Sequence, residues 1–198
     1  MSVKRLLREV RACRACAANL PLGARPVLQI AGTARLLIVG QAPGRKVHQT
    51  GVPWDDASGG RLRDWMGLDS SDFYDDSRVA ILPIGFCYPG AGERGGDRPP
   101  RPECAPLWHE RLTTLLPDLQ LTLLVGQYAH RHYLASTRKA SLTETVRAFP
   151  NYGPRFFPLP HPSWRSVMWM RKHPWFEQST IPELRKVVRN CMGLGTAV

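Results

Sequence analysis

Four of the five cysteines in this chain of 198 residues are spaced in a way that suits metal ligation. Cys13 and Cys16 form a C-x-x-C pair, and Cys87 and Cys104 follow much later with sixteen residues between them. Four thiolates can hold a 4Fe–4S cluster or a tetrahedral zinc ion. Burial in the core is the ordinary alternative, and the Pro- and Gly-rich surroundings of Cys87 argue against it. We therefore predict a metal site made of these four residues, with Cys191 outside it.

Two further segments place polar or glycine-rich residues directly after an apolar run of strand type. The segment Gly40–Gly44 follows the run Leu36–Val39, and His161–Ser163 follows Phe156–Pro160. Open α/β sheets bind their ligands in loops at the carboxyl ends of the strands. We therefore expect the two segments to meet at that edge of a sheet and to form a ligand site.

The pattern of apolar residues predicts the elements that must position these side chains. Helices are expected over 3–16, 58–65, 103–115, 128–134, 141–149 and 181–191, and strands over 35–40, 79–86, 121–126 and 156–160. Pro83 is expected to end regular pairing in the second strand, and Ser141 with Glu144 fits a capping box. The stretches 41–54 and 87–102 are expected to be loops. Because strands alternate with helices, the predicted fold class is α/β with parallel pairing.

Length and composition limit the domain organisation. With 43% hydrophobic residues, the chain can bury one sizeable core and is short for two, so we expect a single domain over 1–198. No apolar stretch reaches the length that crosses a bilayer, and the start Met1–Arg5 leads into a helix without the apolar core of a signal peptide. We expect a cytoplasmic monomer with no membrane partner.

The charge balance bears on the partner. Lys and Arg total 27 against 16 Asp and Glu, which gives a formal net charge of +11 and a pI near 10.0. A strongly basic surface attracts polyanions by electrostatic steering and counterion release. Charge alone fits a merely well-solvated protein equally well, but the planar fork of arginine suits phosphate. Nucleic acid is therefore the expected partner.

Taken together, the motifs are similar to those of the uracil-DNA glycosylase superfamily, in particular its iron–sulfur branch (families four and five). The resemblance rests on Gly40–Gly44, Gly51–Trp54, the order and spacing of the four cysteines, and His161–Ser163, and it spans nearly the whole chain. It implies a three-layer α/β/α domain around a four-stranded parallel sheet. It also implies a 4Fe–4S cluster that fastens the N-terminal segment 1–30 to the loop 87–104.

The resemblance implies a hydrolase, a DNA N-glycosylase that removes uracil or a related deaminated base in base-excision repair. Such an enzyme must flip the nucleotide out of the duplex and hold its base by stacking and edge hydrogen bonds. Trp54 has the position of the family's stacking aromatic, with an ordinary core aromatic as the alternative. His161 corresponds to the motif histidine that hydrogen-bonds the departing base, on which negative charge grows.

The same resemblance gives further contact residues. The expected base-binding residues besides Trp54 are Gly40, Ala42, Ile84, Gly85 and His48, and the expected DNA-contacting residues are Ser163, Trp164, Arg165, Arg171 and Lys172. Trp164 and Arg165 are expected to form a loop that enters the minor groove, the first as an apolar wedge and the second near phosphate. The family more often has proline where Trp164 stands. A merely solvated basic surface at Arg171 and Lys172 would look the same in sequence.

The first motif departs from the family pattern at the position that activates water. Gln41 stands where the iron–sulfur branch often has a carboxylate, and Ala42 stands where the other major branch has one. Gln41 can orient a water but cannot take its proton. We therefore assign the water-orienting or cation-stabilising role to Asp56, with Asp55 as the substitute. An acidic pair favoured by the dipole of a helix N-terminus is an equally good interpretation of these two residues.

A second departure concerns the choice of base. Pro83 stands where an asparagine usually reads the uracil edge, and the backbone of Ile84 or Gly85 is expected to take over that contact. Three rivals to a uracil-DNA glycosylase therefore remain: a damage-recognising DNA-binding protein without catalysis, a glycosylase for another lesion such as hypoxanthine, and a zinc-bearing nucleic-acid module of unrelated activity.

Overall fold

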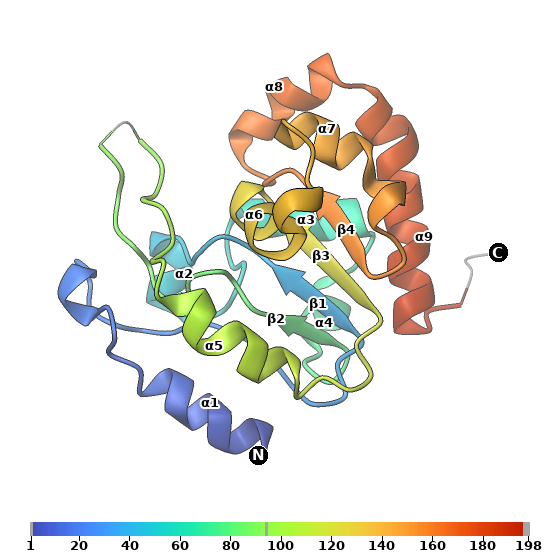
Figure 1. The fold of residues 1–198 in the computed structure, drawn as a ribbon. Helices are drawn as coiled ribbons and strands as arrows, with labels where there is room; N and C mark the ends of the chain where they lie inside the picture. The colour runs from blue at the N-terminus through green and yellow to red at the C-terminus, as the bar shows by residue number, and fades with distance from the viewer. Residues whose placement is uncertain (1, 94, 196–198) are drawn as a thin grey trace.

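A computed structural model describes residues 2–93 and 95–195, and one sheet of four parallel strands lies at its centre. The strands are β1 (Leu36–Val39), β2 (Val79–Ile81), β3 (Leu121–Val125) and β4 (Phe156–Leu159). Their spatial order is β2-β1-β3-β4, and each neighbouring pair is parallel (Figure 1). The predicted four-stranded parallel sheet is confirmed.

Helices flank this sheet on both faces. They are α1 (Val3–Arg11), α2 (Arg45–Thr50), α3 (Ala57–Met66), α4 (Ser70–Tyr74), α5 (Cys104–Thr113), α6 (Gln127–Leu134), α7 (Leu142–Arg147), α8 (Trp164–Lys172) and α9 (Ile181–Met192). Short 3₁₀ turns cover Ala17–Asn19, Ala135–Thr137 and Phe149–Tyr152, and a π-helical turn covers Phe176–Thr180. Among the described residues, no helix combines the length and the apolarity that crossing a membrane requires.

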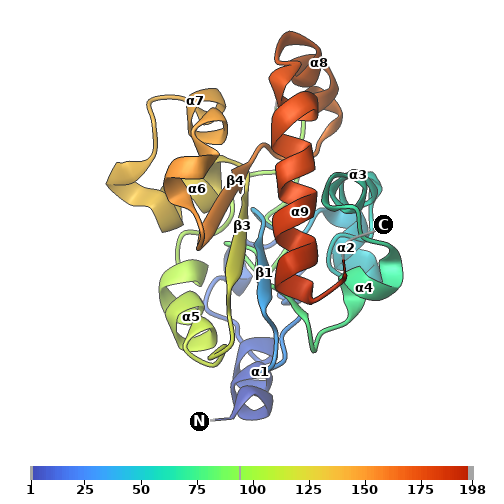
Figure 2. The ribbon, with the colours of Figure 1, turned by 90° about the vertical axis from the view of Figure 1, so that its right-hand side faces the viewer.

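The strands are apolar along their length because both faces of the sheet are covered. Leu36 and Ile38 of β1 pack into one buried cluster with α3 and α9, and Leu37 and Val39 pack into another with α1 and α5. This division follows from the two-residue period of a strand. Figure 2 shows the sheet edge-on between the layer of α5 and α6 and the layer of α3, α4 and α9. The architecture is the predicted three-layer α/β/α arrangement.

Prolines and caps end the elements largely where the sequence indicates. Pro83 lies beyond the end of β2, and Pro158 lies in β4, an edge strand in which a missing N–H is tolerated. The Ser141 hydroxyl accepts from the Glu144 N–H at 3.1 Å, and the Glu144 carboxylate accepts from the Ser141 N–H at 3.0 Å. The predicted capping box at α7 is therefore confirmed.

Four helices differ from the prediction. No helix is predicted over α4, whose five residues are too few to show an apolar period. α1 ends at Arg11, so Cys13 and Cys16 lie in the irregular segment after it rather than on the helix. α2 lies in a stretch predicted to be a loop, because six residues are too few to show an apolar period. α8 begins at Trp164, where the resemblance implies a loop, and Ser163 is its N-cap residue. Trp164 and Arg165 are thus presented by the first turn of a helix.

His130 ties α6 to the sheet from a buried position. Its Nε2–H donates to the carbonyl oxygen of Leu124 on β3 at 2.9 Å. Burial lowers the pKa of His130 to about 4, whereas a histidine in an unfolded chain titrates near 6.5. The unfolded chain therefore binds more protons in this interval, and His130 makes the protein less stable as the pH falls from about 6.5 towards 4.

We predict that His130→Gln reduces the difference in the free energy of unfolding between pH 7 and pH 4 by about 3 kcal/mol. Glutamine keeps a donor for the Leu124 carbonyl but does not titrate. Urea denaturation of both proteins at the two pH values measures the difference. An unchanged pH dependence in the variant would show that His130 is not the group that titrates.

Candidate active site

A pocket of about 430 Å³ opens at the carboxyl ends of the central strands. The loop Gly40–Gly44 after β1, Gln127 and Tyr128 after β3, and His161 and Ser163 after β4 all line it. The two segments singled out in the sequence therefore meet in one cavity. Its position is the usual ligand-binding edge of an open α/β sheet, and its volume lies in the range of small-molecule sites.

Trp54 forms one wall of the pocket and is held there by two glycines. A Cβ built on Gly40 would lie 2.8 Å from the Trp54 ring, and one built on Gly59 would lie 1.7 Å from the Trp54 carbonyl oxygen. Trp54 itself has a φ of 57°, a left-handed conformation that costs a non-glycine residue on the order of 1–3 kcal/mol. Packing against the two glycines therefore fixes the position of the ring.

His161 lies beside Trp54, with ring centroids 5.7 Å apart and planes inclined by 34°. Gly126 precedes α6 with a φ of 89°, a left-handed conformation that favours glycine, and a Cβ there would meet the His161 Cβ at an ordinary contact distance of 3.4 Å. Arg61 of α3 donates to the Pro162 carbonyl at 2.9 Å and so holds the motif. Burial lowers the pKa of His161, although the nearby charge of Asp56 opposes this. The ring is therefore neutral at neutral pH and can donate one hydrogen bond.

Asp56 and Asp55 have different surroundings. Asp56 lines the pocket from the start of α3, where its Oδ1 accepts from the Gly59 N–H at 2.8 Å. It is therefore a helix cap and a pocket carboxylate at once. Asp55 is not among the lining residues and forms an ion pair with Lys46 at 3.6 Å. The structure thus brings Asp56, and not its neighbour, into the cavity that contains His161.

The segment after β2 contributes less than the sequence suggests. Gly40, Gln41, Ala42 and Pro83 line the pocket, whereas Ile84 and Gly85 do not. The Ile84 N–H donates to the Gly40 carbonyl oxygen at 2.9 Å, and the Gly85 N–H donates to the Gln41 carbonyl oxygen at 2.9 Å. The expectation that these amides read a base is wrong, because each is already paired within the protein.

His48 also lies elsewhere than expected. It is buried in α2 outside the pocket lining, with its ring centroid 6.1 Å from that of Tyr88. Burial, together with the charge of Arg25, lowers the pKa of His48. Arg25 also donates to the His48 carbonyl at 2.7 Å. His48 therefore packs against Tyr88 and does not face the pocket.

The first turn of α8 carries the remaining expected contacts. Ser163, Trp164 and Arg165 line the pocket, and Trp164 is 72% exposed. The Arg165 guanidinium lies 5.3 Å from the centroid of the Trp164 ring. Met168, one turn further on, is 54% exposed, so the helix presents an apolar strip next to the cavity. Arg171 and Lys172 are exposed in the last turn and do not line it.

Four polar lining residues were not predicted as site residues from the sequence: Ser58, Asp97, Gln127 and Tyr128. Gln127 and Tyr128 follow β3 and Gly126 directly, so the rule that identified the other two loops would have found them. Asp97 lies in the Pro- and Gly-rich loop between β2 and α5, and nothing in the neighbouring sequence indicates that it faces the pocket. Its position depends on how that loop folds back over the sheet.

Comparison with known families agrees with this geometry. Residues 29–185, more than half of the chain, match the family model of the uracil DNA glycosylase superfamily. The chain belongs to the uracil-DNA glycosylase superfamily. Membership supports a DNA glycosylase activity in general. A solution NMR structure of a proposed uracil DNA glycosylase from Methanosarcina acetivorans is similar at a TM-score of 0.44 and 17% identity, covering 82% of this chain and 93% of that one. This likeness is too distant to support an argument about activity.

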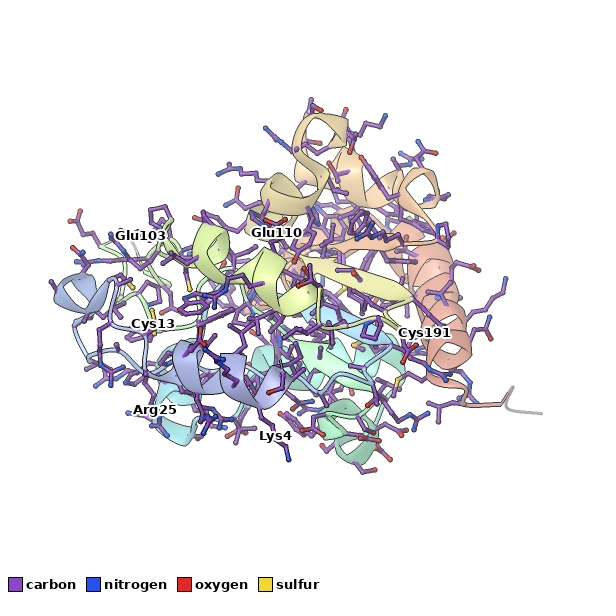
Figure 3. All side chains as sticks on the ribbon, turned by 60° about the horizontal axis from the view of Figure 1, so that its bottom comes forward. Lys4, Cys13, Arg25, Glu103, Glu110 and Cys191 are labelled. Carbon is purple, nitrogen blue, oxygen red and sulfur yellow. The ribbon has the colours of Figure 1, made fainter. Side chains whose placement is uncertain are left out.

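In this member of the superfamily, the four cysteines predicted to bind metal surround one small cavity. Cys13 and Cys16 reach it from the segment after α1, Cys87 from the loop after β2, and Cys104 from the start of α5. Figure 3 shows Cys13 at one end of the molecule and Cys191 at the other. The Cys191 thiol donates to the Arg35 carbonyl at 3.3 Å. Cys191 therefore lies apart from the four.

The donor set around this cavity fits a multi-atom centre. Among the described residues, the Nε1–H of Trp108 and the Nε–H of Arg101 are buried and have no hydrogen-bond partner, and both residues line the cavity. Burial raises the pKa of Cys87 to about 11 and that of Cys104 to about 12, so a bound metal would have to displace their protons. In residues 2–93 and 95–195, no three His, Cys, Asp or Glu side chains are arranged to hold a metal ion. Thiols spread around a space suit a cluster, whose own core separates its ligands.

We predict that Gly40→Ala lowers base excision from DNA about 10²-fold, because the new methyl group would push the Trp54 ring out of position. Gly60→Ala is the matched control, since the nearest atom to a Cβ there is the end of a flexible arginine at 4.0 Å. Single-turnover excision and circular dichroism of both variants make the comparison. Equal rates for the two alanine variants would mean that the contact between Trp54 and Gly40 does not shape the site.

Proposed function

We propose that this protein is a DNA glycosylase that hydrolyses the N-glycosidic bond of uracil or a related deaminated base, in base-excision repair. The observation that carries the proposal is the meeting of Trp54, His161 and Asp56 in one pocket. An aromatic face, a neutral hydrogen-bond donor and a carboxylate are what a flipped base and its sugar need for cleavage. Membership of the superfamily supports the same class of reaction.

Trp54 and His161 act on the base in this proposal. The flipped base stacks on the Trp54 ring, which the two glycines hold in place. His161 donates a hydrogen bond to the base as the glycosidic bond breaks and negative charge accumulates on it. Because His161 is partly buried, this hydrogen bond forms in a medium of lower dielectric constant than water, where it is stronger.

Asp56 and Gln41 act on the sugar and on water. The sugar becomes positively charged as the base departs, and the carboxylate of Asp56 stabilises that charge. Its Oδ1 is fixed by the Gly59 N–H, which leaves Oδ2 for the pocket. The amide of Gln41 orients the attacking water without taking its proton.

The face of α8 next to the pocket holds the DNA. Trp164 is exposed enough to fill the gap that a flipped nucleotide leaves in the stack. Arg165 lies beside it, and Arg171 and Lys172 extend the basic surface along the same helix. The net charge of +11 supports binding to a polyanion. We propose DNA with a damaged base as the partner and one copy of the chain as the active unit.

A panel of oligonucleotides tests the proposal. Single-stranded and duplex DNA carrying uracil, hypoxanthine or xanthine is incubated with excess enzyme, and abasic sites are detected by alkaline cleavage. Excision of uracil or of a related deaminated base supports the proposal. If every lesion survives while binding to damaged DNA persists, the protein is a damage-recognition protein and the proposal is wrong.

The end of β2 is a reason to include a deaminated base other than uracil, such as hypoxanthine, as a second candidate substrate. Pro83 replaces the usual asparagine, and its carbonyl already accepts from His109 Nε2 at 2.9 Å. With the Ile84 and Gly85 amides also paired, the end of β2 presents little with which to read uracil. Gln127 is an amide on the lining that can read a base edge. Faster excision of hypoxanthine than of uracil in the same panel would select this substrate.

We predict that His161→Ala lowers single-turnover excision about 10²-fold or more, while the dissociation constant for damaged DNA stays within about threefold. The reason is that the hydrogen bond gains strength only as charge develops on the base. His161→Gln, which retains a donor, should recover part of the rate. If binding and excision fall together in His161→Ala, the side chain holds DNA rather than the transition state.

We propose further that Cys13, Cys16, Cys87 and Cys104 hold a 4Fe–4S cluster, with zinc as the alternative. When bound, the cluster would cross-link otherwise irregular segments through its bonds to the four thiolates. Its role would be structural, because the hydrolysis requires no electron transfer. Protein purified without oxygen should be brown, absorb in the visible range and contain iron and acid-labile sulfide. A colourless preparation with one zinc per chain would establish the alternative.

The buried N–H of Trp108 offers a sharper test of the cavity. We predict that Trp108→Phe, which removes the N–H and keeps an aromatic ring, speeds the loss of visible absorbance to an iron chelator about 10-fold. Trp65→Phe is the matched control, because Trp65 is also buried but packs in the cluster with α9. Identical bleaching in the two variants would mean that Trp108 makes no hydrogen bond to the centre.

A further inference from the structure

Asp97 lines the pocket and has no part in the function proposed above. It lies in the long loop before α5, which Figure 1 shows as a green excursion standing above α2. Two backbone hydrogen bonds shape the described part of this loop. The Gly92 N–H donates to the Gly96 carbonyl at 2.8 Å, and the Arg98 N–H donates to the Gly90 carbonyl at 2.8 Å. Asp97 is therefore placed by the backbone of its own loop.

Asp97 and Asp56 both approach the backbone of Gly44. A Cβ built on Gly44 would lie 3.4 Å from Oδ2 of Asp97 and 3.9 Å from Oδ2 of Asp56. The two carboxylates come from segments about forty residues apart in the sequence and gather around one glycine of the first motif. Asp97 is thus a second acidic group, besides Asp56, next to the loop Gly40–Gly44. Within that loop, the polar side chain at position 41 is the neutral amide of Gln41.

The surroundings of Asp97 do not neutralise it. The titratable or charged side chains that line the pocket with it are Asp56, Tyr128, His161 and Arg165. Within residues 2–93 and 95–195, the Asp97 carboxylate accepts no hydrogen bond and forms no ion pair. Asp97 is exposed at the edge of the pocket, and the partial desolvation of its carboxyl, together with the negative charge of Asp56, raises the pKa of Asp97. Aspartates with a structural role here accept backbone N–H groups, as Asp69 does at the N-cap of α4 and Asp75 does in the turn after it.

The free oxygens of Asp97 distinguish it from Asp56. One oxygen of Asp56 already accepts from the Gly59 N–H, so that carboxylate is fixed by its helix. Among the residues that the structure describes, neither oxygen of Asp97 has a protein partner, and neighbouring negative charge makes such a carboxylate a stronger base. General bases in enzymes are tuned in this way towards the working pH.

We propose that Asp97 is a catalytic residue that accepts a proton from the attacking water, an inference that rests on the function proposed above. The bond between C1′ and the base breaks, and its electron pair leaves with the base, which His161 hydrogen-bonds. The water oxygen bonds to C1′ while one water proton passes to Asp97. That proton then returns through solvent to the nitrogen of the departed base. The products are an abasic sugar with a C1′ hydroxyl and a neutral base.

Asp97→Asn tests the assignment, because it keeps the size of the side chain and removes the basicity. Glu93→Gln is the matched control, since it removes a charge from an exposed position of the same loop. On a lesion that the wild-type enzyme excises, Asp97→Asn should lower the single-turnover rate about 10²-fold or more. The dissociation constant for DNA should stay the same or fall, because a negative charge is lost, and Glu93→Gln should match the wild type.

The melting temperature gives a second readout that is independent of the lesion. Because the folded pKa of Asp97 is raised, folding disfavours its charged form, and this penalty appears as the pH rises above the unfolded value near 3.9. Asp97→Asn should therefore raise the melting temperature at pH 7 and change it less at pH 3. Glu93→Gln should show no such pH-dependent gain.

The outcomes separate the role of Asp97 from the proposed function. Wild-type excision by Asp97→Asn would overturn the role of Asp97 and leave the proposed function intact. A lower melting temperature for Asp97→Asn at pH 7 would show that the residue is structural and would also overturn it. If the wild-type enzyme excises no lesion, the proposed function and the role of Asp97 are both wrong.

Discussion

The contact between the Trp54 ring and the backbone of Gly40 is the constraint on which the pocket depends. It joins the loop after β1 to the segment before α3, and it exists only because Gly40 and Gly59 have no side chain. Trp54 also adopts a positive φ to reach this place. From there its ring centroid lies 5.7 Å from that of His161. Trp54, in a strained conformation, thus connects the motif Gly40–Gly44 with the motif His161–Ser163, which follows the last strand of the sheet.

The sheet could be predicted from the sequence because its strands are continuous apolar runs separated by helices. Because both faces of the sheet are buried, every residue of β1 is apolar, and the strand can be recognised in the sequence as a continuous apolar run. The three helices that were not predicted, α2, α4 and α8, have no continuous apolar run of this kind. α2 is a six-residue helix between Gly44 and Gly51, too short for a period. α8 exposes Trp164 and Met168, so its apolar residues do not define one buried stripe.

The same contrast applies to the site. Gln41 and His161 could be located because parallel topology fixes where the residues after each strand must lie. Asp97 could not, because its place depends on the path of an irregular loop. The expected role of the Ile84 amide failed for a related reason. Its hydrogen bond to the Gly40 carbonyl is a tertiary contact that the local sequence does not encode.

The segment 83–87 connects the pocket to the cysteine cavity. Its first residue lines the pocket, its amides hold the carbonyls of Gly40 and Gln41, and its last three residues line the cavity. The Phe86 N–H also donates to Sγ of Cys104 at 3.3 Å. A centre bound by the cysteines would therefore brace the first motif from behind. Such a brace matters to a hydrolysis that uses no electrons, because a displacement of about 1 Å in a catalytic group can slow a reaction about 10²-fold.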